Sequence, residues 1–159
     1  IVCNESQQTS VADVYAAGDC CESHDISSET DRILALLPNA YMQGNCAGIN
    51  MAGGSAFYEN AIAINAAGFC GLHLVTAGSY AGEAIVTQSE TGYRKLVVKD
   101  GLLKGFIIVG DVARSGIYTA LIRNKTPLSS IDFDLIREHP GLMAFSRHER
   151  DVMLGGADA

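Results

Sequence analysis

The stretch "TSVADVYAAGDCC", residues 9–21, joins an apolar run, a small-residue turn, a single carboxylate and two adjacent cysteines. Its valines and tyrosine favour an extended backbone and its alanines allow close packing, so the pattern predicts a short buried strand over residues 11–17 that ends at Gly18. Asp19 would then stand at the carboxyl end of that strand. Two interpretations are open at this point: Asp19 binds a ligand, or it caps an ordinary turn.

The composition is that of a folded protein with many tight turns. The chain has 159 residues, of which 48% are apolar, 18% are charged and 17 are glycine, and this length can bury a core without metals or disulfides. The formal net charge of −7 argues against a nucleic-acid-binding surface, which needs clustered Lys and Arg. No apolar run approaches the roughly 18 residues of a membrane helix. We therefore expect neither nucleic acid nor a membrane as a partner, and because the chain begins with Ile1 we expect it to be a piece of a longer protein.

The cysteines are odd in number and irregular in spacing: Cys3, Cys20, Cys21, Cys46 and Cys70. This favours reduced thiols in a cytoplasmic protein. A structural zinc site needs two pairs of closely spaced ligands, and no such spacing is present, so we expect no metal. The adjacent Cys20 and Cys21 do not form a C-x-x-C dithiol, and we assign neither a catalytic role.

The first third of the chain is expected to continue with a loop and a helix. Residues 22–31 are polar, rich in Ser, Asp and Glu, and predict a surface loop. Pro38 suits the first turn of a helix, and small and apolar residues follow it at helical spacing. The sequence therefore predicts a helix from Pro38 to about Met51, which the glycine pair at 53–54 ends.

The second half alternates β-branched residues with glycines, as in "GLHLVTAGSY" and "EAIVTQSETGYRKLVVKDGLLKGFIIVGD". This pattern predicts several short strands. The Asp100-Gly101 pair between two apolar runs is a strong signal for a hairpin turn. Strands that follow one another directly favour an antiparallel sheet, and a helix after them gives an α+β unit.

Helices are expected after the strands. Asp111 has the character of an N-cap, and the apolar residues that follow mark one face of a helix that ends near Asn124. A shorter helical turn is predicted over residues 133–137. Residues 145–159, "FSRHERDVMLGGADA", have little pattern and are expected to form a loose tail.

Two segments carry a resemblance to a known family. "TSVADVYAAGD" resembles the second flavin-binding motif of the FAD-dependent pyridine nucleotide-disulfide oxidoreductases, and "LLPNAYMQGNCAGINMAG" resembles the helix that follows it there. The resemblance implies that Gly18 and Asp19 bind FAD, with the Asp19 carboxylate accepting hydrogen bonds from the ribityl chain. It also implies that the main-chain N–H of Leu37, just before Pro38, lies at the pyrimidine edge of the flavin. These are positioning roles, and we expect no catalytic residue in this chain.

The second half is similar to the C-terminal interface, or dimerisation, domain of the same family. The similarity is closest to the NADH-dependent rubredoxin reductases and the flavoprotein portions of NAD(P)H-nitrite reductases. Family members that reduce disulfides carry a glutamate five residues after the histidine of a His-Pro pair. Here His139-Pro140 is followed by Ala144 at that position, which disfavours the disulfide-reducing branch.

The resemblance implies an α+β fold in two parts. Residues 1–55 would be the end of an FAD-binding domain, a strand and a helix of a Rossmann-like unit. Residues 56–159 would be the interface domain, an antiparallel sheet with helices packed on it.

The function implied for the parent protein is transfer of electrons from NAD(P)H through FAD to an acceptor. That acceptor could be rubredoxin, a nitrite-reducing partner or oxygen. The parent would be a cytoplasmic homo-oligomer. The chain by itself is expected to be inactive and to bind FAD poorly, because the family's Gly-rich pyrophosphate motif does not occur in it.

Two alternatives remain at this stage. The chain could serve as a dimerisation or assembly module without a bound cofactor. A stand-alone enzyme is disfavoured, because no Ser-His-Asp, Cys-His or paired-carboxylate spacing stands out.

Overall fold

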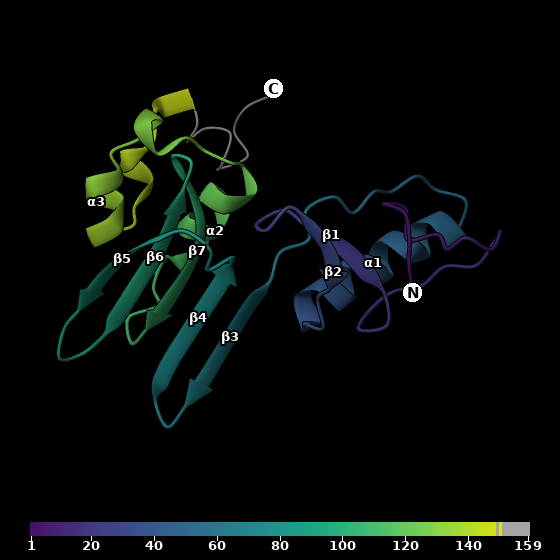
Figure 1. The fold of residues 1–159 in the computed structure, drawn as a ribbon, viewed down its shortest axis with the longest axis horizontal. Helices are drawn as coiled ribbons and strands as arrows, with labels where there is room; N and C mark the ends of the chain where they lie inside the picture. Colours follow the sequence, from purple (N-terminus) through teal and green to yellow (C-terminus); the bar gives the residue numbers. More distant parts are fainter. Residues whose placement is uncertain (149, 151–159) are drawn as a thin grey trace.

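The computed structural model describes residues 1–148 and 150. Figure 1 shows two groups of elements side by side, a sheet with its helices and a smaller group that contains the N-terminus. The smaller group holds a two-stranded antiparallel hairpin and one long helix: β1 (Glu22–Asp25), β2 (Thr30–Ile33) and α1 (Leu37–Met51).

The larger group is built on a five-stranded antiparallel sheet with the order β3-β4-β7-β6-β5. Its strands are β3 (Ile64–Phe69), β4 (Leu72–Gly78), β5 (Glu83–Gln88), β6 (Tyr93–Lys99) and β7 (Leu102–Val109). The hairpin between β6 and β7 turns at Asp100 and Gly101, whose φ angles of 54° and 72° match the type I′ turn that an Asp-Gly pair favours. The predicted hairpin is confirmed.

Two helices follow the sheet, α2 (Ser115–Arg123) and α3 (Phe133–Glu138), with short 3₁₀ turns at Leu128–Ser130 and Leu142–Ala144. Helix α2 packs on β7 and β4, and the rings of Phe106 and Tyr118 meet at a centroid distance of 5.5 Å in the core. The Tyr118 hydroxyl donates to the carbonyl of Ile136 at 2.8 Å, which fastens α3 to α2. The predicted fold class, an antiparallel sheet with helices packed on it, is confirmed.

The smaller group is attached to the sheet by main-chain and side-chain contacts. The N–H of Ile26 donates to the carbonyl of Ala61 at 3.0 Å, and both Ile26 and Ile62 belong to the core that the sheet and α2 form. Glu29, in the turn between β1 and β2, lies 3.4 Å from the amine of Lys104 on β7. The hairpin thus reaches across to the larger group.

The helix predicted from Pro38 to Met51 is confirmed, since α1 covers Leu37–Met51. The glycine pair ends it as expected: Gly53 has a φ of 82°, and the N–H of Gly54 donates to the carbonyl of Ile49 at 2.9 Å. The helical turn predicted over residues 133–137 is likewise confirmed as α3.

The strand predicted over residues 11–17 is wrong. Val11 and Val14 are exposed, and the N–H of Val14 folds back onto the carbonyl of Val11 at 3.2 Å. Thr9 contributes a further local bond, because its hydroxyl accepts the N–H of Val11 at 3.2 Å. Small polar side chains and a left-handed Asp13, with a φ of 62°, favour successive turns over a strand.

The surface loop predicted over residues 22–31 is also wrong, because these residues belong to the β1–β2 hairpin and bury a carboxylate. Asp25 is fully buried. It accepts the N–H and the hydroxyl of Ser27 at 2.9 and 2.6 Å, and the Arg32 guanidinium donates to it through Nε, at 2.8 Å, and Nη2. A polar composition predicts a loop only when its side chains face water, and here they bond to one another.

Asp111 does not cap α2. Its carboxylate accepts the N–H of Ala113 at 3.0 Å and closes a turn, and the helix begins at Ser115 after Arg114, whose φ is 61°. In the expected tail, Phe145 is buried in the core. Residues 149 and 151–159 of that tail lie outside the described residues.

We predict that Asp25→Asn lowers the free energy of unfolding by about 1–3 kcal/mol, because Arg32 and Ser27 then lose a charged acceptor. Burial acts to raise the pKa of Asp25, but the bonds from Ser27 and Arg32 hold the pKa below its usual value. The difference in the free energy of unfolding between wild type and variant is therefore largest above the unfolded pKa of about 3.9. It shrinks as the pH falls through the lower folded pKa. Urea denaturation at several pH values measures it.

The matched control is Asp31→Asn in the same hairpin, because the Asp31 carboxylate is exposed and its one partner within the described residues is the exposed His24. Its effect should stay within about 0.5 kcal/mol at neutral pH. Equal losses for the two variants would contradict the structural role given to Asp25.

Candidate functional site

The turn at Gly18 lies directly against α1. Gly18 has a φ of 87° and its N–H donates to Oε1 of Gln43, in the second turn of the helix, at 2.7 Å. A Cβ atom added to Gly18 would stand 3.8 Å from the Cβ of Ala40. The structure therefore brings the Gly18–Asp19 turn to within about one helical turn of the start of α1, although no strand leads into that turn.

Gln43 holds this arrangement together. Its side chain is 1% exposed, its carbonyl oxygen receives the Gly18 N–H, and its amide nitrogen donates to the hydroxyl of Ser23 on β1. One side chain thus joins the turn, the hairpin and the helix. Both polar atoms of the buried amide have partners, as burial requires.

The sequence reasoning missed Gln43 and its neighbours on the helix. Asn39 is also buried; its amide nitrogen donates to the carbonyl of Ile62 at 3.0 Å, and its oxygen accepts the hydroxyl of Tyr58 at 2.6 Å. Asn50 bonds to the main chain of Ser6. The signal was available: amide side chains at positions 39, 43 and 50 recur at the spacing of one helical face, so that face of α1 bonds to the chain around it.

Asp19 is exposed, and its carboxylate has no hydrogen-bond partner in the part of the chain that the structure describes. The turn is instead closed by main chain, since the N–H of Cys21 donates to the carbonyl of Gly18 at 3.1 Å. An aspartate that capped this turn would accept a nearby N–H. The carboxylate is therefore available to an external donor.

The start of α1 is also available. Leu36 occupies the N-cap without a side-chain hydrogen bond, and the first turn holds no acidic residue. Leu37 is 87% exposed, its N–H has no acceptor among the described residues, and Pro38 has no N–H to offer. The positive end of the helix dipole thus faces outward with an unpaired donor.

These groups fit the FAD that the resemblance implies. A carboxylate accepts strong hydrogen bonds from the hydroxyls of a polyol chain. A free N–H at a helix start suits a carbonyl oxygen that becomes negatively charged. The Asp19 carboxylate and the Leu37 N–H supply this acceptor and this donor near the start of α1, and neither has a partner in the part of the chain that the structure describes. Gly18 and Pro38 shape the main chain beside them, with the Gly18 N–H already bonded to Gln43.

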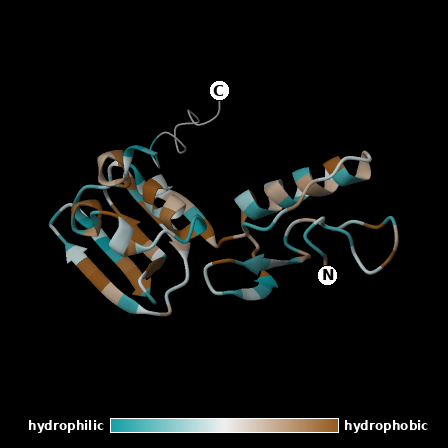
Figure 2. Cartoon of the chain, turned by 90° about the horizontal axis from the view of Figure 1, so that it is seen from above, coloured by the Kyte–Doolittle hydropathy of each residue, from teal (hydrophilic) through white to brown (hydrophobic). Residues whose placement is uncertain are grey.

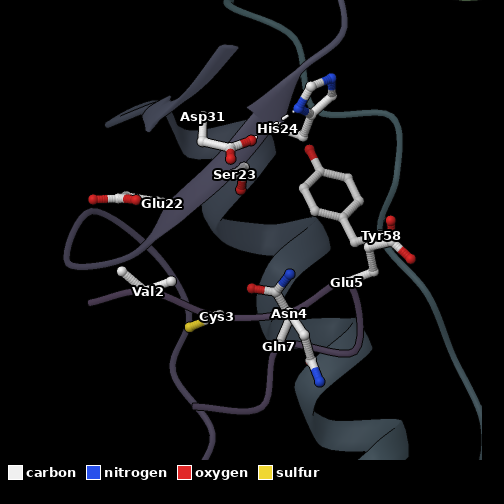
Figure 3. Close-up of a pocket in the computed structure, with 10 residues that line it drawn as sticks. All are labelled: Val2, Cys3, Asn4, Glu5, Gln7, Glu22, Ser23, His24, Asp31 and Tyr58. Carbon is white, nitrogen blue, oxygen red and sulfur yellow. Dashed lines mark hydrogen bonds and ion pairs between the residues drawn. The ribbon is translucent and has the colours of Figure 1, made fainter. Parts of the chain in front are cut away.

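The smaller group also holds a pocket of about 410 Å³ (Figure 3), and none of the four expected site residues lines it. Three carboxylates line it, those of Glu5, Glu22 and Asp31, and the last bonds to Nδ1 of His24 at 2.8 Å. Among residues 1–148 and 150, no group of three His, Cys, Asp or Glu side chains has the arrangement of a metal site.

Helix α1 exposes several apolar side chains; in Figure 2, teal bands alternate with tan and brown ones along that helix. Its exposed apolar residues are Leu37, Tyr41, Met42, Ile49 and Met51. The opposite face carries the amides that bind the rest of the group. Within the part of the chain described, no helix is long and apolar enough to cross a membrane.

Comparison with known proteins agrees with the fold. Residues 70–126 match the rubredoxin NAD+ reductase C-terminal domain. The epsilon subunit of NADH-dependent phenylglyoxylate dehydrogenase from Aromatoleum evansii is 31% identical over 140 residues, which are 82% of this chain and 33% of that subunit. The chain thus spans about a third of the length of this curated relative.

Two solved structures share the fold. An FAD-dependent pyridine nucleotide-disulphide oxidoreductase from Desulfovibrio vulgaris superimposes with a TM-score of 0.75 at 20% identity, over 97% of this chain and 42% of that one. NADH:rubredoxin oxidoreductase from Clostridium acetobutylicum superimposes with a TM-score of 0.58 at 24% identity, over 82% and 32%. The chain therefore contains the rubredoxin NAD+ reductase C-terminal domain at residues 70–126 and has a fold similar to that of the C-terminal part of pyridine nucleotide-disulfide oxidoreductases.

Proposed function

We propose that this chain is the C-terminal part of an FAD-dependent NAD(P)H oxidoreductase. The observation that carries the proposal is the attachment of the Gly18 turn to α1 through Gln43. This attachment holds the Asp19 carboxylate near the start of α1, where the Leu37 N–H lies, and among residues 1–148 and 150 neither group has a hydrogen-bond partner. The relatives support it, since their names describe NADH-dependent enzymes.

Asp19 would accept hydrogen bonds from the ribityl hydroxyls and fix the position of that arm. Gly18 lets the main chain turn there, since its φ of 87° disfavours other residues. The N–H of Leu37, followed by Pro38, would hold the pyrimidine edge of the ring. When bound, FAD supplies the two-electron chemistry between a nicotinamide and the acceptor.

The two groups of elements support two roles within the chain. We propose that residues 1–55 complete an FAD-binding domain, because every group in the candidate site comes from them. Residues 56–159 would form the interface domain, whose core lies between the sheet and α2. The chain connects them through residues 56–63, which precede β3.

For the acceptor we propose a small electron-carrier protein such as rubredoxin, in line with the name of the Clostridium acetobutylicum enzyme. A nitrite-reducing partner and oxygen remain the alternative acceptors. We also propose a cytoplasmic location, which the free state of all five cysteines supports.

A second function, assembly, is favoured by the exposed apolar edge of the sheet. Phe69 is 80% exposed at the end of the edge strand β3, and Leu72 beside it is also exposed. An edge strand with exposed apolar side chains invites pairing with a second copy. We propose that this edge contributes to a homo-oligomer.

The test of the flavin site uses the complete polypeptide to which this chain belongs. Asp19→Asn should raise the dissociation constant for FAD about 10- to 100-fold, because a charged acceptor of hydroxyl groups is lost. Flavin fluorescence quenching during titration of the deflavinated protein measures it. The control is Asp13→Asn, an exposed carboxylate in the same segment whose left-handed backbone Asn also tolerates. Unchanged affinity in Asp19→Asn would refute the assignment.

The purified 159-residue chain should be colourless. Asp19 and the start of α1 supply only part of the contacts to FAD, and no Gly-rich turn that could hold the pyrophosphate occurs in the sequence. Absorbance near 450 nm, compared with the protein concentration, checks this. A yellow preparation with close to one flavin per chain would show that these residues suffice for binding.

The oligomer is tested on the same chain by equilibrium sedimentation. We expect a dimer, and Phe69→Ser should shift it toward the monomer at equal concentration because the apolar edge is broken. Phe57→Ser, at an exposed phenylalanine outside the sheet, should leave the dimer unchanged. A monomeric wild-type chain would remove the support for the assembly role.

A further inference from the structure

Three of the five cysteines are gathered on the turn that leads to Asp19. Their thiols donate hydrogen bonds to the carbonyl oxygens of three consecutive residues. Cys3 donates to Ala16 at 3.8 Å, Cys20 to Ala17 at 3.4 Å, and Cys21 to Gly18 at 3.4 Å. Consecutive residues are only about 3.8 Å apart along the chain. The three thiols therefore occupy one small volume.

Cys3 and Cys21 lie on neighbouring segments, with their thiols on the carbonyls of Ala16 and Gly18, two residues apart in the same turn. The segment of Cys3 is held beside that of Cys21 by main chain, because the N–H of Glu22 donates to the carbonyl of Ile1 at 2.9 Å. Gln7 closes the far side, with its oxygen 3.9 Å from Cys21 Sγ. The two segments are thus held side by side by the main chain.

The two thiols differ in access. Cys3 is half-buried and lines the 410 Å³ pocket of Figure 3. Cys21 is fully buried. A small reagent can therefore reach Cys3 from the pocket, whereas Cys21 can be reached only through Cys3 or by opening of the turn.

We propose that Cys3 and Cys21 form a redox modification site, in which a low-molecular-weight disulfide such as oxidised glutathione converts the two thiols into an intramolecular disulfide. In the first step the Cys3 thiolate attacks the reagent, forms a mixed disulfide and releases one small thiol. In the second step the Cys21 thiolate attacks the Cys3 sulfur and releases the other small thiol. The protein loses two electrons and two protons, and the reagent gains both.

The second step limits the rate. Burial, with the nearby thiols of Cys3 and Cys20, raises the pKa of Cys21 to about 11. Only the thiolate attacks, so the rate of disulfide closure increases about tenfold for each pH unit up to that pKa. At neutral pH the mixed disulfide at Cys3 accumulates before the ring closes.

Cys20 is the competitor that the test has to separate, since it is exposed and adjacent. The experiment therefore compares the wild-type chain with Cys20→Ser, each incubated with oxidised glutathione at pH 7, 8 and 9. Free thiols are trapped with N-ethylmaleimide, and digested peptides are identified by mass spectrometry. We expect a Cys3–Cys21 cross-link in both proteins, with a rate that increases about tenfold per pH unit.

Two variants define the mechanism. Cys21→Ser should stop at the glutathione adduct on Cys3, with no cross-link. Cys70→Ser should behave as wild type, because Cys70 lies in the β3–β4 turn, away from the cluster. Circular dichroism confirms that each variant is folded, and Cys3→Ser replaces Cys21→Ser if the buried substitution unfolds the chain. In Cys3→Ser, Cys21 should stay reduced.

A different product overturns the proposal. If Cys20→Ser abolishes the cross-link, or if wild type gives only a Cys20–Cys21 disulfide, Cys3 and Cys21 are not the reacting pair. The same holds if Cys3 and Cys21 are both still free to react with N-ethylmaleimide after prolonged incubation with oxidised glutathione. None of these outcomes depends on flavin, so the result is separate from that of the flavin titration.

Discussion

The hydrogen bond from the Gly18 N–H to the side chain of Gln43 is the contact on which the candidate site depends. Gly18 lies outside the helices and strands, and this bond ties it to α1. Because Gln43 also bonds to Ser23, the helix cannot shift relative to the hairpin without leaving a buried amide unpaired. The position of Asp19 relative to the helix start is set by this shared side chain.

The smaller group is stabilised by polar contacts more than by apolar packing. Asp25 is buried with Ser27 and Arg32, and Asn39 and Gln43 are buried on the helix. The apolar core lies mainly between the sheet and α2. Helix α1 shows the same preference. Its amide side chains face the rest of the smaller group, and several of its apolar side chains, which would normally form a core, face outward.

The sequence predicted best where one local rule decides the backbone. Asp100-Gly101 fixes a turn by its dihedral preferences, and Pro38 with the glycine pair marks the ends of α1. It failed where hydrogen bonds that the composition does not reveal decide the backbone, such as those of Thr9 with Val11 and of Arg32 with Asp25. Val11 resembles a strand residue but stays exposed, and residues 22–31 look like a loop until Arg32 bonds to Asp25. The four expected site residues could be named from a motif, whereas Gln43 emerges only from the amide spacing on one helical face.

The turn before Asp19 makes hydrogen bonds to several parts of the smaller group. The carbonyls of residues 16–18 accept three thiols, the Gly18 N–H donates to Gln43, and the Asp19 carboxylate has no partner in the described part of the chain. A disulfide between Cys3 and Cys21 would replace thiol contacts to Ala16 and Gly18 by a covalent link across the turn. Because Gly18 is tied to α1, that change would alter the spacing between Asp19 and the helix start. The ribityl arm and the isoalloxazine ring are covalently joined, so a change in this spacing would affect both of their proposed contacts together.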